Sequence, residues 1–348
     1  MEQQPQTWTV KRILEWTSGF LEKKAVDSPR LSAELLLAHV LKLPRIKLYT
    51  DYDRPLIDSE LASFREFVRR AGEHQPIAYL TGTAHFFDLE LDIKPGVLIP
   101  RPDTETLVET ALSFCRHTTG MESPRVLDLC TGSGCIAAAI AKHLPTAAVV
   151  AVDIDPVAVQ LTQANLLKLK LSDRVTVLQG NLYEPLTALI NCAPFHLILS
   201  NPPYIRTGDI AALDRSVRDF EPHQALDGGP DGLAFHRRIL AGASQRLLPG
   251  GKVMLEIAFD QGKAALAMAS EHRLLGSAKI LKDAAGHDRV LSMAAATTLA
   301  SQSPGIRSSR MLYLRLMDED SLSHRFALSA QLHWNRVVGS FIAGGDLR

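Results

Sequence analysis

The chain has 348 residues, and its 38 Lys and Arg balance 38 Asp and Glu, which gives a formal net charge of +0. This balance argues against a dedicated duplex-DNA-binding protein, because such proteins normally carry a basic excess that displaces counterions. A hydrophobic content of 46% and a charged content of 22% exclude wholesale disorder. The length is sufficient for one large hydrophobic core or two smaller ones.

The absence of a recognisable targeting signal, together with the cysteine usage, predicts a cytoplasmic protein. The N-terminus has no cationic region followed by an apolar run, and no apolar stretch approaches the roughly 18 residues that span a bilayer. The cysteines form no C-x-x-C pair and lie in no His-rich context; they are Cys115, Cys130, Cys135 and Cys192. We therefore expect reduced thiols, no membrane association and no metal site.

Residues 1–82 predict a small all-helical domain. Its first helix has apolar positions at helical spacing, from Val10 to Leu21. A second helix is expected to start with Ser28 as the N-cap and Pro29 in the first turn. A third carries an apolar face that runs from Ile57 to Ala71, and it should end at Gly72.

Residues 83–100 predict a β-hairpin linker. Apolar and acidic residues alternate from Phe86 to Ile93, which is the period of a half-exposed strand. Lys94-Pro95-Gly96 supplies the expected turn.

Residues 101–295 alternate short apolar runs with helix-compatible stretches. The runs are Val126–Leu129, Ala148–Val152, Val175–Leu178, Phe195–Leu199 and Lys252–Ile257. The stretches are Cys135–His143, Pro156–Leu171 and Asp231–Leu248. Repeated β-α-β units of this length predict an α/β fold with a mostly parallel, doubly wound sheet. Ligands bind such sheets at the carboxyl ends of the strands.

Residues 296–348 are interpreted as a C-terminal extension of unknown role. Ser301-Gln302-Ser303-Pro304-Gly305 is typical of a linker. The apolar pieces that follow, Met311–Met317 and Trp334–Ile342, show neither a repeat nor a chemical motif.

The first two strands lead into residues suited to a nucleoside. The segment from Cys130 through Thr131, Gly132 and Ser133 to Gly134 is a Gly-rich turn that opens a helix and offers backbone N–H groups to an anionic group. Asp153, about twenty residues later, can accept both ribose hydroxyls. Nicotinamide, flavin and S-adenosylmethionine sites share this pattern, so it leaves the cofactor open.

The next two strands end in residues suited to an amine. Asn181 can accept from an exocyclic amine and Leu182 can border adenine. The fourth strand runs into Asn201-Pro202-Pro203-Tyr204, where two prolines stiffen the turn. The Asn201 side-chain oxygen and the Pro202 carbonyl can accept both hydrogens of a planar NH₂ group, while Tyr204 offers a flat stacking surface. This pattern predicts methylation of an amide or exocyclic amine, since both N–H bonds are held while charge develops on nitrogen.

The chain resembles the release factor glutamine methyltransferase family, also called HemK or PrmC, over roughly residues 10–293. The Asn-Pro-Pro-Tyr motif is shared by many amino-group methyltransferases, but the other segments and their order are more specific. The segments are Pro76–Gly82, Leu98–Glu105, Cys130–Gly134, Asn201–Tyr204, Phe220–Leu226 and Gly229–Leu233.

The resemblance implies a seven-stranded, Rossmann-like class I methyltransferase domain preceded by a helical domain that grips a protein substrate. It implies methyl transfer from S-adenosyl-L-methionine to the glutamine amide in the Gly-Gly-Gln motif of peptide chain release factors. By position, Cys130–Gly134 would hold the methionine part, Asp153 the ribose and Leu182 the adenine. Asn201–Tyr204 would hold the substrate glutamine, with Asn201 also near the cofactor.

Three residues depart from the family pattern, and two other substrates remain open. Cys130 replaces a usual glycine, Asn181 stands where aspartate is common, and Ala258 where glycine is frequent. The sequence Cys-Thr-Gly-Ser-Gly-Cys also resembles the loop of a sister group of enzymes, which methylate a glutamine of a ribosomal protein. A DNA adenine methyltransferase would use the same Asn-Pro-Pro-Tyr, but it should bring a basic recognition region. We therefore expect no direct sequence-specific nucleic-acid binding.

Overall fold

The computed structural model describes residues 7–188, 193–272 and 275–295. All of them belong to one compact unit, Met1–Ala296. The predicted C-terminal extension and Cys192 lie outside the described residues. Within the described residues, no helix is both long and apolar enough to cross a membrane.

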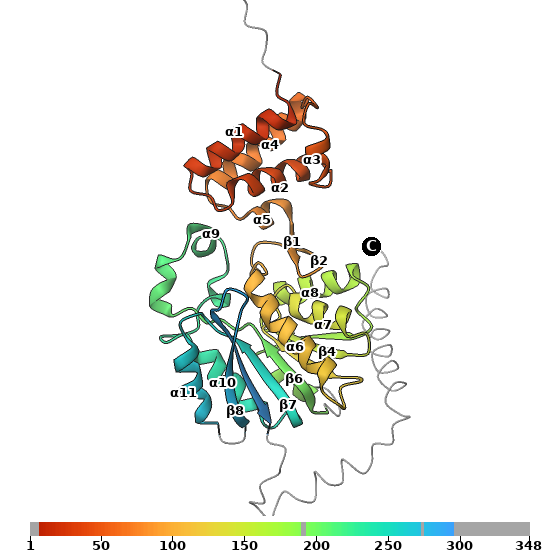
Figure 1. The fold of residues 1–348 in the computed structure, drawn as a ribbon, viewed down its shortest axis with the longest axis vertical. Helices are drawn as coiled ribbons and strands as arrows, with labels where there is room; N and C mark the ends of the chain where they lie inside the picture. Colours follow the sequence, from red (N-terminus) through yellow and green to blue (C-terminus); the bar gives the residue numbers. More distant parts are fainter. Residues whose placement is uncertain (1–6, 189–192, 273–274, 296–348) are drawn as a thin grey trace, which may run out of the picture. The chain divides into compact units, whose positions relative to one another are not determined.

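The N-terminal part is helical, as the sequence predicts (Figure 1). Its helices are α1 (Val10–Lys23), α2 (Pro29–Leu41), α3 (Lys47–Thr50), α4 (Asp58–Gly72) and α5 (Ile77–Thr81). Their shared core is built around fully buried side chains of α1, α2 and α4, among them Leu14, Leu36 and Phe64.

Two details of these helices differ from the prediction. Ser28 does precede α2, but its backbone is left-handed (φ 45°) and its side chain makes no capping hydrogen bond. Ile57 does not join the buried face of α4: it is 62% exposed, because it lies before the first turn of the helix. Its backbone N–H donates instead to the Glu60 side chain (3.1 Å).

The β-hairpin is present and Lys94-Pro95-Gly96 is a turn as predicted, but the hairpin itself turns inside the segment predicted as a single strand. β1 (Thr83–Phe86) pairs with β2 (Leu89–Asp92) in antiparallel register, with Phe86 opposite Leu89. The turn is therefore at Phe87-Asp88, inside the alternating segment, and Lys94-Pro95-Gly96 follows the hairpin. Phe87 has a positive φ of 57°, and its N–H donates to Glu105 (2.8 Å), so a side chain from a later helix stabilises this turn.

A seven-stranded sheet forms the centre of the C-terminal part, with the order β5-β4-β3-β6-β7-β9-β8. β3 to β7 are parallel, and β9 is antiparallel to β7 and β8. The strands are β3 (Arg125–Leu129), β4 (Ala148–Asp153), β5 (Val175–Gln179), β6 (Phe195–Ser200), β7 (Leu247–Glu256), β8 (Leu275–Lys282) and β9 (Asp288–Ala295). The five parallel strands match the five predicted apolar runs, whereas the sequence did not single out β8 and β9.

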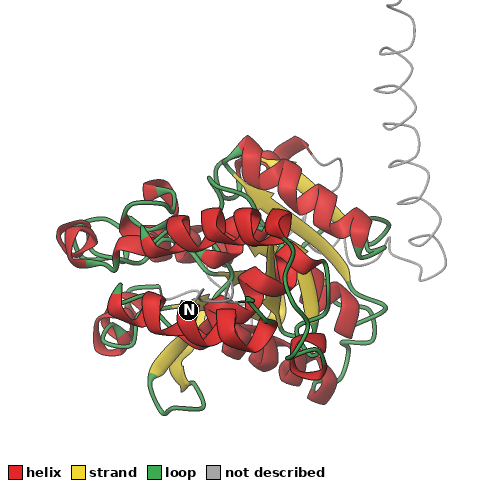
Figure 2. Cartoon of the chain, turned by 90° about the horizontal axis from the view of Figure 1, so that it is seen from above, coloured by secondary structure: helices red, strands yellow, loops and turns green. Residues whose placement is uncertain are grey.

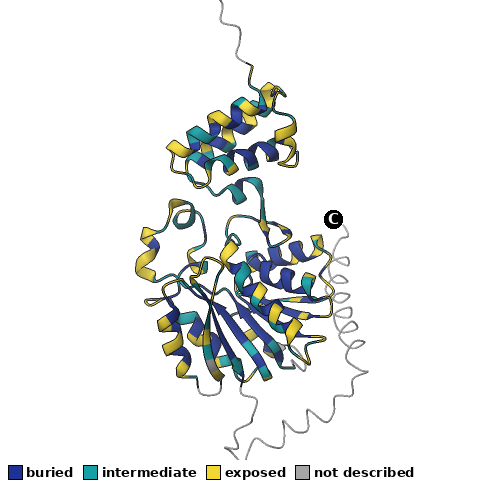
Figure 3. Ribbon diagram, viewed as in Figure 1, coloured by how far each residue is buried: buried dark blue, intermediate teal, exposed yellow. Residues whose placement is uncertain are grey.

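Helices cover both faces of this sheet (Figure 2). They are α6 (Glu105–His117), α7 (Cys135–His143), α8 (Pro156–Lys168), α10 (Ala234–Ala243) and α11 (Gly262–Ser270), whereas the short helix α9 (Arg215–Arg218) belongs to the loop between β6 and α10. Short 3₁₀ turns occupy Pro102–Thr104, Glu184–Ala188, Thr207–Ala212 and His223–Ala225. Successive strand residues alternate between two cores: Val126 packs with α6 to α8, and Leu127 packs with α10 and α11. Both faces of the strands are therefore buried (Figure 3).

This topology fixes where a ligand can enter. β3 lies between β4 and β6, so the connections leave it in opposite directions on its two sides. In open α/β sheets, the crevice beyond the carboxyl ends of the strands at such a point is the binding site. The residues that follow β3, β4 and β6 are those singled out from the sequence.

Candidate active site

One pocket gathers most of the predicted site residues at the carboxyl ends of β3 to β6. The predicted site residues that line this pocket are Cys130, Thr131, Gly132, Ser133, Asp153, Leu182, Asn201 and Pro203. Gly134, Pro202 and Tyr204 belong to the same loops but do not line it. Among the described residues, no cluster of three or more His, Cys, Asp or Glu could hold a metal ion.

The loop after β3 is a tight turn with three left-handed residues: Cys130 (φ 58°), Gly132 (φ 59°) and Gly134 (φ 81°). The left-handed backbone at Cys130 explains why glycine is usual at this position in the family pattern, since a side chain strains such a backbone. Burial raises the pKa of the Cys130 thiol to about 12, so this cysteine is a packing residue and not a nucleophile. A Cβ on Gly134 would lie 2.8 Å from Thr162 Cγ2, so glycine is required there by close packing as well as by φ.

Polar side chains of α8 hold two backbone carbonyls of this loop. The Thr162 hydroxyl donates to the Gly132 carbonyl (2.9 Å), and Asn165 Nδ2 donates to the Ser133 carbonyl (2.9 Å). Asn165 also bonds both the backbone N–H (2.7 Å) and the carbonyl (3.1 Å) of Asp92. One buried amide on α8 therefore connects the loop to strand β2 of the hairpin.

Asp153 ends β4 beside this loop. Its Oδ2 accepts from the Gly132 N–H (2.8 Å) and its Oδ1 from the Asp155 N–H (2.9 Å). These bonds fix the carboxylate at the pocket wall. Burial nevertheless raises its pKa, as expected for a carboxylate that faces a cleft with few charged partners.

The wall after β5 differs from the prediction in one contact. The Asn181 side-chain oxygen already accepts from Arg238 Nη2 (2.8 Å), and its amide group donates to Glu184 (3.2 Å). Arg238 and Phe235, both on α10, line the pocket and were not predicted from the sequence. Leu182 lies on the same wall with a left-handed backbone (φ 51°).

The Asn-Pro-Pro-Tyr segment after β6 is tied down at both ends. Asn201 Nδ2 donates to the Thr104 hydroxyl (3.0 Å), so its Oδ1 is the atom left to accept from a ligand. The Tyr204 hydroxyl donates to Glu256 Oε1 (3.2 Å). Tyr204 therefore anchors the segment at the end of β7, and the structure places no ring face of it among the pocket walls.

Glycines let other segments approach this turn closely. A Cβ on Gly228 would lie 2.7 Å from Tyr204 Cα and 2.8 Å from the Pro203 carbonyl oxygen. A Cβ on Gly232 would collide with the Tyr204 carbonyl oxygen and with Gln261 Nε2. Gln261 Nε2 donates to that same carbonyl (2.9 Å). The glycines around residues 228–232 are thus required by the backbone packed against them.

The remaining segments that carry the family resemblance meet at another wall of the pocket. The Tyr79 hydroxyl donates to the Val97 carbonyl (2.6 Å). Arg101, which lines the pocket, forms an ion pair with the buried Glu221 (2.5 Å). Glu221 also accepts from the Ile99 N–H (3.3 Å). Glu221 therefore joins segments 98–105 and 220–226, and Tyr79 ties segment 76–82 to Val97, the residue just before segment 98–105.

Together, the sheet, the loop, the acidic residue after β4 and the Asn-Pro-Pro-Tyr turn after β6 define a class I methyltransferase. Residues 12–82 match the PrmC N-terminal domain, and residues 107–218 match the methyltransferase small domain. The release factor glutamine methyltransferase of Geobacter sulfurreducens is 44% identical over 78% of this chain and 91% of its own length. That of Rhodopirellula baltica is 43% identical over 82% and 96%. The chain therefore belongs to the release factor glutamine methyltransferase family.

Among solved structures, a methyltransferase from Pyrococcus furiosus matches with 20% identity and a TM-score of 0.43. That match covers 67% of this chain and 98% of the other.

Proposed function

We propose that this protein transfers a methyl group from S-adenosyl-L-methionine to the side-chain amide nitrogen of the glutamine in the Gly-Gly-Gln motif of peptide chain release factors. The observation that carries the proposal is the orientation of Asn201: its NH₂ group is committed to Thr104, which leaves Oδ1 to accept a substrate N–H. Family membership supports the substrate, since the curated relatives are named for release factors.

The pocket residues fit the cofactor. The left-handed loop Cys130–Gly134 leads into α7. The N–H groups of Thr131, Gly132 and Gly134 already donate within the protein, so the N–H groups at the start of α7 are those that would suit the carboxylate of the methionine part. The Asp153 carboxylate would accept the ribose hydroxyls, and Leu182 would border the adenine. Gly134 contributes by setting the loop against α8 and not by contact. When bound, the cofactor supplies an electrophilic methyl group.

The chain's own residues prepare the amide nitrogen. An amide nitrogen is weakly nucleophilic because its lone pair is delocalised. Asn201 Oδ1 and the Pro202 carbonyl would accept its two N–H bonds, which fixes the nitrogen and favours the positive charge that develops on it during transfer. Pro203 and Tyr204 keep this turn rigid. The proton leaves during or after transfer, so no general base is needed.

The same proposal covers the partner, the location and the division of the chain. Release factors are the protein partner, so the site of action is the cytoplasm, where translation ends. No direct sequence-specific nucleic-acid binding is involved. Residues 1–82 form the helical substrate-binding domain, 83–100 the hairpin linker and 101–295 the methyltransferase domain. Residues 296–348 are a C-terminal extension of unknown role.

A methyl-transfer assay tests this proposal. Enzyme, labelled cofactor and a purified bacterial release factor should give one labelled peptide that contains Gly-Gly-Gln, identified by mass spectrometry. A release factor in which that glutamine is replaced should take up no label. Preferential labelling of a ribosomal protein would favour the sister activity, and labelling of DNA would favour adenine methylation; either result contradicts the proposal.

A further inference from the structure

A buried ion pair lies behind one wall of the pocket. The Glu221 side chain is 1% exposed, and its Oε1 accepts from Arg101 Nη2 (2.5 Å). The other oxygen of Glu221 accepts from the Ile99 N–H (3.3 Å). Since replacing a buried ion pair by apolar side chains is often neutral or even stabilising, stability alone is a weak reason for this pair.

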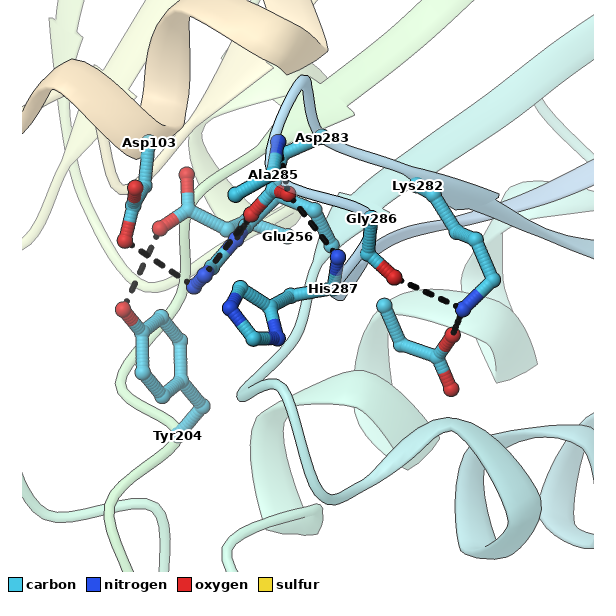
Figure 4. Close-up of polar contacts among 10 residues, drawn as sticks. Asp103, Tyr204, Glu256, Lys282, Asp283, Ala285, Gly286 and His287 are labelled. Carbon is cyan, nitrogen blue, oxygen red and sulfur yellow. Dashed lines mark hydrogen bonds and ion pairs between the residues drawn. The ribbon is translucent and has the colours of Figure 1, made fainter.

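The arginine of this pair reaches the pocket with donors to spare. Arg101 is 30% exposed and lines the pocket. Within the described residues its Nε and Nη1 atoms make no hydrogen bond. Asp103 does not compete for it, because Asp103 pairs with Arg289 (3.1 Å), which also pairs with Asp283 (3.1 Å) (Figure 4). The wall therefore presents a positive charge that is held in place from behind.

The other cation among the described residues that line the pocket is Arg238, and it belongs to a different side. Arg238 donates to Asn181, which follows β5. The segment of Arg101 instead contacts the residue that follows β6, through the bond between Thr104 and Asn201. Strands β4 and β3 lie between β5 and β6 in the sheet. Of these two cations, Arg101 is therefore the one on the side of the Asn-Pro-Pro-Tyr turn.

The cofactor brings one negative charge to that side. The sulfur that carries the methyl group also carries the methionine chain, so a methyl group that faces Asn201 places the methionine carboxylate only a few bonds away. The loop after β3 is a poor partner for this charge, because the N–H groups of Thr131, Gly132 and Gly134 already donate within the protein. The start of α7 offers N–H groups and a partial positive charge, but no full charge. Arg101 supplies the full charge that these groups lack.

We propose that Arg101 is a cofactor-binding residue that recognises the carboxylate of the methionine part, and that Glu221 is the positioning residue that aims its guanidinium. The inference rests on the proposed function in one respect, the assignment of this pocket to S-adenosyl-L-methionine with its methyl group toward Asn201. A guanidinium suits the task because its planar donors match the two oxygens of a carboxylate. Arg101 thereby separates the intact cofactor from adenosyl compounds that lack the carboxylate.

This role predicts a particular kinetic signature. The carboxylate takes no part in methyl transfer, so its ion pair stabilises the bound cofactor and the transition state equally. Loss of Arg101 should therefore raise the KM of the cofactor and leave kcat nearly unchanged. A residue that only supports the Asn-Pro-Pro-Tyr turn would lower kcat instead.

The main test compares two ligands that differ in the carboxylate alone, S-adenosyl-L-methionine and its decarboxylated form. Wild-type protein should bind the intact cofactor about tenfold to a hundredfold more tightly in calorimetry, which is the range of a hydrogen bond to a charged group. Arg101→Gln should lose about that factor for the intact cofactor, but less than about threefold for the decarboxylated form.

Three further variants sharpen the comparison. Arg238→Gln removes the other cation of the pocket and is the matched control; it should keep the preference for the intact cofactor. Arg101→Lys keeps the positive charge without the planar donors and should retain part of the preference. Glu221→Gln keeps the shape of the side chain but releases the guanidinium, so the preference should again fall part of the way.

The same measurements can overturn the inference. Equal losses for both ligands in Arg101→Gln would make the arginine a structural link between its two segments, and a preserved preference would place the carboxylate elsewhere; either result overturns it. An unchanged preference in Glu221→Gln overturns the positioning role.

Two complications have their own controls. Should Arg101→Gln fail to fold because Glu221 is left unpaired, the double variant Arg101→Gln/Glu221→Gln removes both charges, and its preference decides in the same way. The binding assays contain no release factor. Wild-type enzyme that binds the cofactor but leaves the release factor unmethylated therefore refutes the proposed function and not this inference.

Discussion

Replacing Asn165 with alanine should weaken both the fold and the cofactor site. The side chain is fully buried and makes three hydrogen bonds, to Asp92 N, Asp92 O and Ser133 O. Alanine leaves these backbone groups without partners, and each such group costs about 1–3 kcal/mol. Water that enters the vacated polar space recovers part of this loss. We therefore expect the free energy of unfolding to fall by about 2–5 kcal/mol.

The measurement must report on the domain that contains Asn165. All three tryptophans, Trp8, Trp16 and Trp334, lie outside residues 101–295, so tryptophan fluorescence is a poor probe and circular dichroism in urea is preferred. Gln163→Ala, an exposed amide on the same helix, is the control and should be nearly neutral. Cofactor affinity should drop in Asn165→Ala only. Equal stability of the two variants would show that the amide does not hold the hairpin and loop together.

Three further predictions concern the pocket. Asp153→Ala should weaken cofactor binding by about 1.5–3 kcal/mol through loss of a charged hydrogen-bond acceptor, and unchanged affinity in calorimetry would remove Asp153 from the site. Asn201→Ala should lower the methyl-transfer rate by about 10²–10³-fold with little change in release factor binding, and a parallel loss of binding would contradict its role at the reacting amide. Burial raises the pKa of Asp128 from 3.8 to about 7, so its contribution to stability is full below the unfolded pKa and is lost as the pH rises to about 7. Asp128→Asn should therefore melt at a higher temperature relative to wild type at about pH 8 than at about pH 4, and a constant difference between the two would contradict this.

The sequence predicted those parts of the fold whose signal is local. The parallel strands are continuous apolar runs, and α7 follows its left-handed loop from Cys135 as expected. β8 was missed because Gly276, Ser277 and lysines interrupt the apolar pattern of this edge strand. Such a composition protects a sheet edge from pairing with other chains, but it also hides the strand in the sequence. The turn at Phe87-Asp88 was missed because Phe87 adopts its positive φ with help from Glu105, a contact that no local pattern reveals.

The site shows the same division between local and distant information. Asn201 and Asp153 could be found because they follow strands in a recognisable order. Glu256 carried one weak signal, an acid at the end of a short apolar run, but its contact with Tyr204 depends on strands β6 and β7 being neighbours. Thr104 gave no signal by itself.

The packing explains why the segments beyond Asn-Pro-Pro-Tyr are the more specific ones. The turn supplies the acceptors for an amine, and any such methyltransferase needs it. Thr104 comes from segment 98–105 and sets the amide of Asn201. Gly232 comes from segment 229–233 and leaves room for the Tyr204 carbonyl, while Gln261 donates to it. Since a reacting nitrogen must be held to within a fraction of an ångström, residues that fix the turn also help to fix the acceptors that would hold it. A segment that never touches the substrate can therefore still identify the reaction.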